Sequence, residues 1–294
     1  MIGPITYKTL CQKERELLKS FRFLTPITLG ESVCGKPIEA ISVGCGKKTV
    51  MMNACHHGSE HLTSALLLDF LEEIALCLEC GERRFALNLR SLFECRRLIL
   101  VPTVNPDGVA LATEGLDAAS PRAERLIALN EGSRDFSKWQ ANARGVDLNH
   151  NYDYRFLEYK RLEAERGIEP GATLFSGNHP ESEPETSALC RFVRDNQHAL
   201  SAVLSFHSQG EVIYCHDSQK NRHAAEFFHR LTGYAVERAD GTAAFGGFSD
   251  WLSLLGIPAL TIEIGKGENP LPDALSPTLY AELREALFRF LFFF

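Results

Sequence analysis

Two histidines and a glutamate have the side-chain types and the spacing of metal ligands. His57 and Glu60 stand three residues apart, and His207 follows far downstream. Imidazole nitrogens and carboxylate oxygens are donors that catalytic zinc takes, usually three from the protein with a water in the fourth position. A histidine–glutamate pair at this spacing often arises by chance, and a lone histidine at a strand end is often structural. The three residues therefore predict one catalytic zinc site only if the fold brings them together.

The residues around the histidine–glutamate pair predict a strand that turns directly into a helix. An apolar run at residues 49–52 (TVMM) is typical of a buried strand, and apolar residues at helical spacing follow Glu60. Such a turn would fold His57 and Glu60 to the same side. Side chains alternate along a strand end, so we expect the neighbouring His56 to point away from His57. We also expect that His61 is not a ligand.

Two further strands carry residues that could work beside this pair. Residues 200–206 (LSAVLSF) predict a buried strand that ends at His207, and residues 258–265 (PALTIEIG) predict another that contains Glu263. Ligands and catalytic groups of open α/β sheets gather at the carboxyl ends of strands. A carboxylate in an apolar strand is costly unless it is paired, bound to metal or functional. Glu263 is therefore either a salt-bridged strand end or a general base that activates water.

The order of these motifs along the chain is informative. His57 and Glu60 come first, residues 145–151 (GVDLNHN) follow, and then come His207 and Glu263. Each motif is weak by itself, whereas four motifs in this order are specific. In this order the chain resembles the zinc carboxypeptidases of the carboxypeptidase A type, and the resemblance covers most of its length.

A narrower resemblance lies within that family. Residues 139–149 (WQANARGVDLN), 183–186 (EPET), 207–214 (HSQGEVIY) and 263–272 (EIGKGENPLP) are similar to the γ-D-glutamyl-diaminopimelate peptidases of bacterial cell-wall metabolism. Those enzymes cut the bond between the γ-carboxyl group of D-glutamate and the L-centre of meso-diaminopimelate. The resemblance therefore implies a small peptide substrate, the stem peptide of murein.

The resemblance implies a role for each matching residue. Asp147 would orient a histidine ligand through its second ring nitrogen, unless it only forms an Asx turn. Arg144 would stabilise the oxyanion of the reaction, unless it is a surface arginine, since relatives differ in where this loop carries the arginine. The remaining roles fall to the motif residues: zinc ligands His57, Glu60 and His207, and the catalytic base Glu263.

Two departures from the family pattern concern substrate binding. Family carboxypeptidases hold the terminal carboxylate of the substrate with an Asn-Arg pair, where this chain has Asn149 and His150, and histidine cannot make the same bidentate contact. The family tyrosine is missing, and Thr242 stands near its place. Both changes fit a peptidase that recognises a different group at the end of its substrate. A less efficient carboxypeptidase is an equally simple explanation. Ser249 matches a position that lines the side-chain pocket, so Asn149, His150 and Ser249 are the expected substrate contacts.

Composition is that of an ordinary globular enzyme. The chain has 294 residues, of which 45% are hydrophobic and 23% charged. Its net charge of −7 gives no reason to expect binding to nucleic acid or to an anionic membrane. No apolar run reaches the roughly 18 residues of a membrane helix, and no secretory signal is recognisable. We therefore expect one cytoplasmic zinc peptidase domain over residues 1–294, with its nine cysteines as free thiols.

Hydrophobic periodicity predicts an α/β fold. Residues 114–173 have little periodicity, and we expect them to form loops that build the wall of the active site. The family resemblance implies a single-domain zinc carboxypeptidase-like fold, with a mixed eight-stranded sheet and helices on both faces. The predicted strands are residues 27–29, 38–43, 49–53, 97–102, 199–206, 211–214, 234–236 and 259–264. The predicted helices are residues 11–20, 61–80, 184–196, 221–232, 248–255 and 276–292.

The leading hypothesis is a zinc metallopeptidase that hydrolyses the γ-D-glutamyl-diaminopimelate bond of murein peptides with zinc-activated water. One alternative is a conventional metallocarboxypeptidase that acts on peptide C-termini. Another is a non-catalytic, zinc-bearing module that binds cell-wall fragments, although Asp147 and Glu263 beside the ligands argue against it. An aminoacylase of the aspartoacylase type shares the histidine–glutamate start, but the surroundings of Pro184 and Glu263 fit the peptidases better.

Overall fold

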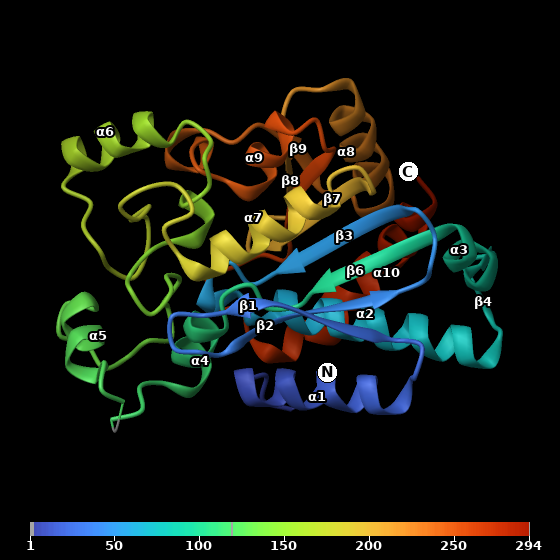
Figure 1. Ribbon diagram of the computed structural model, residues 1–294, viewed down its shortest axis with the longest axis horizontal. Helices are drawn as coiled ribbons and strands as arrows, with labels where there is room; N and C mark the ends of the chain where they lie inside the picture. The colour runs from blue at the N-terminus through green and yellow to red at the C-terminus, as the bar shows by residue number, and fades with distance from the viewer. Residues whose placement is uncertain (1–2, 119, 294) are drawn as a thin grey trace.

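A mixed eight-stranded sheet crosses the molecule (Figure 1). The computed structural model describes residues 3–118 and 120–293. At the centre of the sheet β6, β3, β7 and β10 are parallel neighbours, whereas β1 with β2, β2 with β6, and β10 with β8 pair antiparallel. The fold class is confirmed, and each predicted strand overlaps an observed one. In sheet order the strands are β1 (Thr25–Glu31), β2 (Pro37–Val43), β6 (Arg96–Val101), β3 (Lys48–Ala54), β7 (Leu200–His207), β10 (Ala259–Glu263), β8 (Val212–Cys215) and β9 (Ala235–Glu237).

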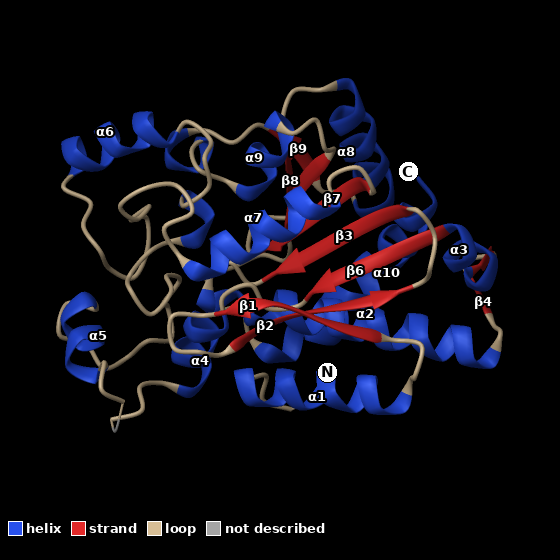
Figure 2. Cartoon of the chain, viewed as in Figure 1, coloured by secondary structure: helices blue, strands red, loops and turns tan. Residues whose placement is uncertain are grey.

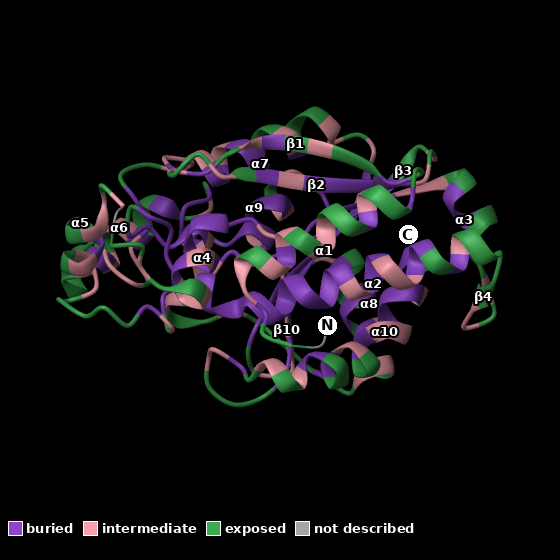
Figure 3. Cartoon of the chain, turned by 90° about the horizontal axis from the view of Figure 1, so that it is seen from below, coloured by how far each residue is buried: buried purple, intermediate pink, exposed green. Residues whose placement is uncertain are grey.

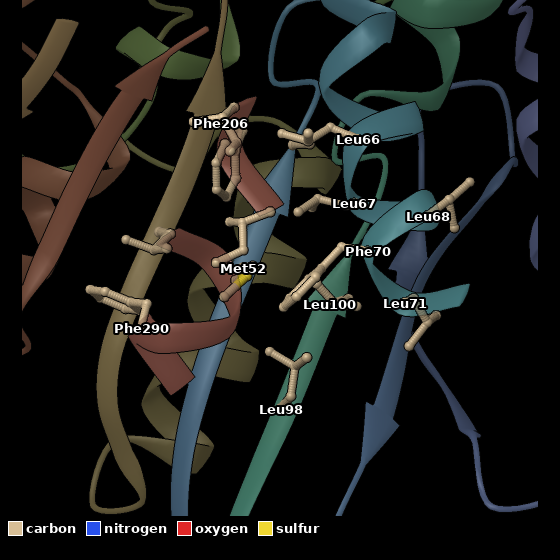
Figure 4. Close-up of a cluster of buried hydrophobic side chains, with 14 of the residues drawn as sticks. Met52, Leu66, Leu67, Leu68, Phe70, Leu71, Leu98, Leu100, Phe206 and Phe290 are labelled. Atoms are coloured by element: carbon tan, nitrogen blue, oxygen red, sulfur yellow. The ribbon is translucent and has the colours of Figure 1, made fainter. Parts of the chain in front are cut away.

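Alternation along the central strands divides the apolar interior into two layers. In β3, Val50 and Met52 belong to one core, and Met51 between them belongs to the other. Figure 4 shows Met52 and Leu100 on the face where Phe70 of the overlying helix packs. Because these strands are buried on both faces, their sequences are nearly continuous apolar runs, which is the pattern that made them predictable.

Helices cover both faces of the sheet, as predicted (Figure 3). Each predicted helix overlaps an observed one. The first face is covered by α1 (Tyr7–Ser20), α2 (His61–Cys80), α3 (Leu89–Cys95), α8 (Gln219–Thr232) and α10 (Ser276–Phe293). The second face is covered by α7 (Pro184–Asn196) and α9 (Phe248–Leu254).

The weakly periodic part of the chain holds helices that the sequence did not predict. Within residues 114–173 these are α5 (Ala123–Leu129) and α6 (Phe156–Arg166); α3 and α4 (Pro106–Glu114), which precede this stretch, were also not predicted. The expectation that residues 114–173 form only loops is therefore wrong. The reason is clear in α6, where only Phe156, Tyr159 and Glu163 are buried and most other positions are charged, so the apolar stripe is weak. Figure 2 shows α5 and α6 joined by long loops beside the arrowheads of β3 and β6.

Two smaller expectations can be compared with the structure. All nine cysteines are free thiols. Among the described residues, no helix combines the length and the apolar character that a membrane span requires.

A short hairpin of β4 (Arg83–Arg84) and β5 (Leu87–Asn88) lies outside the main sheet.

Candidate active site

Three adjacent parallel strands bring the predicted ligands together at one edge of the sheet. β7 lies between β3 and β10, with Ala54 opposite Phe206 and Glu263 opposite His207. The chain then turns at the end of β3, so that His57 reaches the end of β7. Donor atoms of His57, Glu60 and His207 all lie within 4.8 Å of one another. Their convergence follows from the register of parallel strands whose carboxyl ends meet at the same edge.

A short 3-10 turn, Gly58–Glu60, positions the histidine–glutamate pair. His57 precedes this turn with an extended backbone, and α2 begins directly after Glu60. A Cβ atom at Gly58 would lie 2.3 Å from the backbone oxygen of Gly108 in α4. The Gly58 amide also donates a hydrogen bond of 3.0 Å to the Gln140 carbonyl. The turn is therefore held against α4 by a contact that only glycine leaves room for.

The donor atoms have the arrangement of a compact metal site. His57 Nδ1 lies 2.9 Å from Glu60 Oε1, and His207 Nδ1 lies 3.1 Å from Glu60 Oε2. Donor atoms that are each about 2 Å from a tetrahedral zinc ion are roughly 3.3 Å apart. The carboxylate thus faces both imidazoles through the nitrogen atoms that would bind the ion. His56 is not in this group, because its Nε2 lies 2.8 Å from the Tyr152 hydroxyl.

The electrostatics of the group favour a bound cation. Glu60 and Asp147 are both buried, with 3% and 2% of their surface exposed. Burial acts to raise the pKa of Glu60, but His57 and His207 lower this pKa to about 2. Burial likewise acts to lower the pKa of His57, and Glu60 and Asp147 raise it well above its usual value. Two buried carboxylates beside two imidazoles therefore require positive charge, which a divalent ion supplies as well as a proton does.

One carboxylate oxygen atom among the predicted metal ligands accepts no hydrogen bond. Glu60 Oε2 is buried and accepts no well-directed hydrogen bond, although His207 Nδ1 is near. Such an atom is expected where a metal ion completes the contacts of a carboxylate. The donor set, two histidine nitrogens and one carboxylate, is that of catalytic zinc sites. The residues present therefore fit a single zinc ion.

Asp147 lies behind His57, on the side away from Glu60. Its Oδ1 atom is 3.1 Å from His57 Nε2, and it accepts a hydrogen bond of the same length from the Asn149 amide. The other oxygen accepts a 3.0 Å bond from the Leu174 amide. Burial opposes the charge of Asp147, but His57, His150 and these bonds hold its pKa well below the usual range. The carboxylate can thus fix the orientation of His57 and direct Nδ1 toward the ion.

Replacing Asp147 by asparagine should weaken zinc binding by about 10- to 100-fold, because His57 loses the carboxylate that orients its ring and raises its basicity. Competition with a zinc-binding dye measures the change. The exposed Asp240 offers a matched control, and Asp240→Asn should leave the zinc affinity unchanged. Equal zinc affinities for the Asp147→Asn protein and the parent would show that Asp147 only closes a turn.

Glu263 ends β10 directly beside His207. Burial raises the pKa of its carboxyl group to about 7, with Glu60 adding to the rise and His207 and His57 opposing it. It pairs with no lysine or arginine among the described residues. A salt-bridged strand end is therefore not what the structure shows, and a proton acceptor near neutral pH is consistent with this environment.

A cavity opens beside Glu263, and we refer to it as the side-chain cavity. Ser249 and Asn149 line it, as expected for substrate contacts. The Thr261 hydroxyl donates a 2.8 Å bond to Ser249 Oγ, and Asn149 Oδ1 accepts a 3.1 Å bond from the Phe248 amide. The lining residues are Asn149, Tyr214, Cys215, His216, Ala239, Ala243, Gly247, Ser249, Asp250, Thr261 and Glu263.

Two further predicted site residues lie away from this cavity, namely His150, expected as a substrate contact, and Arg144, expected to stabilise the oxyanion. The His150 ring is buried, with Nδ1 2.8 Å from the Phe245 carbonyl oxygen and the ring stacked on Tyr159 at 4.4 Å. The Arg144 side chain is 48% exposed, and its guanidinium lies 3.4 Å from the buried carboxylate of Glu183. Neither residue lines the side-chain cavity.

Several residues around the ligands were not anticipated from the sequence. Asn269 Nδ2 lies 3.4 Å from Glu60 Oε1 and donates a 2.6 Å bond to the Ser208 carbonyl, so it ties both ligand-bearing segments together. The His56 ring stacks on His207 with centroids 5.4 Å apart. Asn269 lies within one of the family-like segments, which was an available signal. Nothing local in the sequence connects it to Glu60, which is 209 residues away.

The chain is similar to proteins of known family over nearly its whole length. Residues 15–282 match the family described as zinc carboxypeptidase. The chain is 33% identical over 282 residues to gamma-D-glutamyl-L-diamino acid endopeptidase 1 of Lysinibacillus sphaericus, covering 94% of this chain and 69% of that protein. It is 29% identical over 127 residues to murein peptide amidase A of Escherichia coli (strain K12), covering 42% of this chain and 50% of that protein. Its fold matches bovine thrombin-activatable fibrinolysis inhibitor in complex with tick carboxypeptidase inhibitor, with a TM-score of 0.74 and 20% identity over 98% of this chain and 96% of that one.

Proposed function

Because the chain belongs to the zinc carboxypeptidase family and is therefore a metallopeptidase, we propose that it hydrolyses the γ-D-glutamyl-diaminopimelate bond of murein peptides. The observation that carries the proposal is the grouping of His57, Glu60 and His207 beside Glu263. The names of two relatives, an endopeptidase for γ-D-glutamyl-L-diamino acid bonds and a murein peptide amidase, support the substrate class. The polar lining of the side-chain cavity is compatible with a diamino acid.

The mechanism follows from the placement of the residues. Zinc, when bound by His57, Glu60 and His207, supplies a Lewis acid that polarises the carbonyl group and activates water. Glu263 takes one proton from the attacking water and later gives it to the departing amine, so the C–N bond breaks as the acid and the amine form. Asp147 keeps His57 in the orientation needed to bind the ion. A role for Arg144 on the carbonyl oxygen requires its guanidinium to leave Glu183.

The side-chain cavity lacks the cation with which family carboxypeptidases hold the terminal carboxylate of the substrate. None of the described residues that line it is lysine or arginine, so a free C-terminal carboxylate would find no permanent cation there. His150, which stands at the family's arginine position, points to the Phe245 carbonyl instead. A terminal carboxylate, which the murein tripeptide also carries, must therefore be held by residues outside this cavity.

The test is an incubation of the zinc-loaded protein with L-Ala-γ-D-Glu-meso-diaminopimelate, with products identified by mass spectrometry. Release of diaminopimelate, abolished in the Glu263→Gln variant, would support the proposal. Cleavage of acyl dipeptides alone would point to a conventional carboxypeptidase. Tight binding of the intact peptide without any product would point to a binding module.

The activity should fall as the pH drops through the pKa of Glu263, which burial raises to about 7 in the metal-free site. A general base works only when unprotonated, so the active fraction falls about tenfold for each pH unit below its pKa. A bound cation lowers this pKa and moves the midpoint to lower pH. The measurement is kcat/KM against pH, with zinc content determined at each point because protonation of His57 also releases metal. A flat profile with zinc fully bound would contradict the role of Glu263.

A further inference from the structure

Asn269 contacts both segments that carry the predicted metal ligands. Its Nδ2 atom donates a hydrogen bond of 2.6 Å to the carbonyl of Ser208, the residue directly after His207. The same atom lies 3.4 Å from Glu60 Oε1, and an amide nitrogen has two hydrogen atoms, so it can serve both acceptors. Asn269 Oδ1 accepts a 2.8 Å bond from the Ser208 hydroxyl. Both polar atoms of the side chain are thus used at the metal site.

The two bonds to Ser208 fix which end of the amide faces Glu60. A carbonyl oxygen only accepts hydrogen bonds, so an amide turned by half a rotation would place Oδ1 against the Ser208 carbonyl oxygen. In the observed orientation the Ser208 hydroxyl also has an acceptor. Glu60 therefore faces a donor from Asn269 and not a second acceptor.

This donor becomes more important when a metal ion is bound. In the empty group, the Nδ1 atoms of His57 and His207 lie 2.9 Å and 3.1 Å from the two Glu60 oxygens. A bound ion takes the lone pair of each of these nitrogens, which then carry no hydrogen for the carboxylate. Among the described residues, Asn269 is then the hydrogen-bond donor that remains for the Glu60 side chain.

The loop after β10 is anchored so that Asn269 reaches this position. The Ile264 amide donates a 2.8 Å hydrogen bond to the His207 carbonyl, and the Gly210 amide donates one of the same length to the Gly265 carbonyl. These bonds hold the start of the loop against the end of β7. The chain then returns over the ligands, where Asn269 is half-buried. Its contact with the metal site therefore follows from the backbone and not from a long, mobile side chain.

We propose that Asn269 is a positioning residue of the metal site, whose amide holds the Glu60 carboxylate in the orientation that binds zinc. Carboxylates that bind metal ions are commonly held by hydrogen bonds from neighbouring groups, which limit how the carboxylate can turn. A neutral amide supplies such a bond without adding charge beside the ion. The proposal concerns the metal site and not the substrate, so it goes beyond the proposed function and is independent of which peptide is cleaved.

Asn269→Ala should weaken zinc binding by about 10- to 100-fold, the range expected when a ligand loses the neighbour that orients it. The zinc Kd is measured by competition with a chelator, at a temperature where the metal-free protein is folded. Asn196→Ala is the matched control, because Asn196 is also half-buried and its amide also donates to a backbone carbonyl, that of Phe192, at 2.8 Å. The control should keep the zinc affinity of the parent.

Cobalt substitution separates positioning from a purely structural role. The visible absorption of the cobalt-substituted protein reports the arrangement of ligands around the ion, so it should change in Asn269→Ala and stay the same in Asn196→Ala. Asn269→Leu keeps the approximate size of the side chain without its polar atoms, and it should behave like Asn269→Ala. It also serves as the test if the alanine variant does not fold.

Two results would overturn the proposal. One is an unchanged zinc Kd and cobalt spectrum together with a lower Tm of the metal-free protein, which would leave Asn269 as a structural tie between loops. The other is an equal loss of zinc affinity in Asn196→Ala, which would make the effect one of general stability. None of these measurements uses a peptide, so their outcome is separate from that of the substrate test.

Discussion

Replacing Glu263 by glutamine should reduce kcat/KM for the murein tripeptide by at least about 100-fold, while zinc binding is retained. Glutamine has nearly the same size and can still accept a hydrogen bond, but it cannot take a proton from water at neutral pH. Glu263 is the acid at the end of β10 beside His207, with a pKa raised to about 7 by burial. Removing it therefore removes both the base that activates water and the acid that protonates the departing amine.

The measurement pairs steady-state kinetics with zinc content determined on the same sample. Glu268→Gln is a suitable control, because Glu268 follows in the same segment and its side chain is 89% exposed. That control should retain both zinc and activity. Near-normal turnover in the Glu263→Gln protein would remove Glu263 from the mechanism, and loss of zinc together with activity would make it part of the metal site.

Removing the metal should abolish activity in the parent protein, and adding zinc should restore it. Alanine at His207 should abolish activity irreversibly, because only two of the three donor residues then remain. Loss of one buried partner also leaves the Glu60 carboxylate less compensated. We expect this variant to bind zinc too weakly for recovery by added metal.

Thermal unfolding gives a readout of the same site that does not depend on turnover. A ligand present at 100 times its Kd stabilises the folded state by about 2.7 kcal/mol, so zinc should raise the Tm of the metal-free parent protein. His207→Ala should lose this shift. His61→Gln is the matched control, since His61 follows Glu60 directly but lies 2.8 Å from Asp273 and outside the ligand group. A zinc-dependent shift that survives in His207→Ala would place the metal elsewhere.

Only some of the residues near the side-chain cavity could be placed there from the sequence. Ser249 was expected to line the side-chain pocket, and it lines the side-chain cavity together with Asn149, which was expected to contact the end group of the substrate. His150 was expected to contact the end group of the substrate together with Asn149, because the pair stands where the family has Asn-Arg, yet its ring stacks on Tyr159 instead. Adjacent residues of a short 3-10 turn point in different directions, so proximity in sequence did not imply a shared surface.

Residue types and spacing were sufficient to predict the strands, the order of the motifs and the turn that joins His57 to Glu60. Each of these depends on local information, namely apolar runs of strand length and a two-residue gap between ligand types. The helices in residues 114–173 could not be predicted in this way. α5 and α6 bury few side chains, so their sequences show no helical repeat of apolar residues.

Which distant side chains meet could be seen only in the folded molecule. The fold placed Asn269 on Glu60, joined Arg144 to Glu183, and set Asp250 beside Glu263 in one cavity. These contacts depend on the register of parallel strands and on the path of loops over the sheet edge, neither of which leaves a periodic trace in the chain. The kind of chemistry could thus be predicted from residue types and spacing, whereas the charge and shape of the substrate-binding wall required the folded molecule.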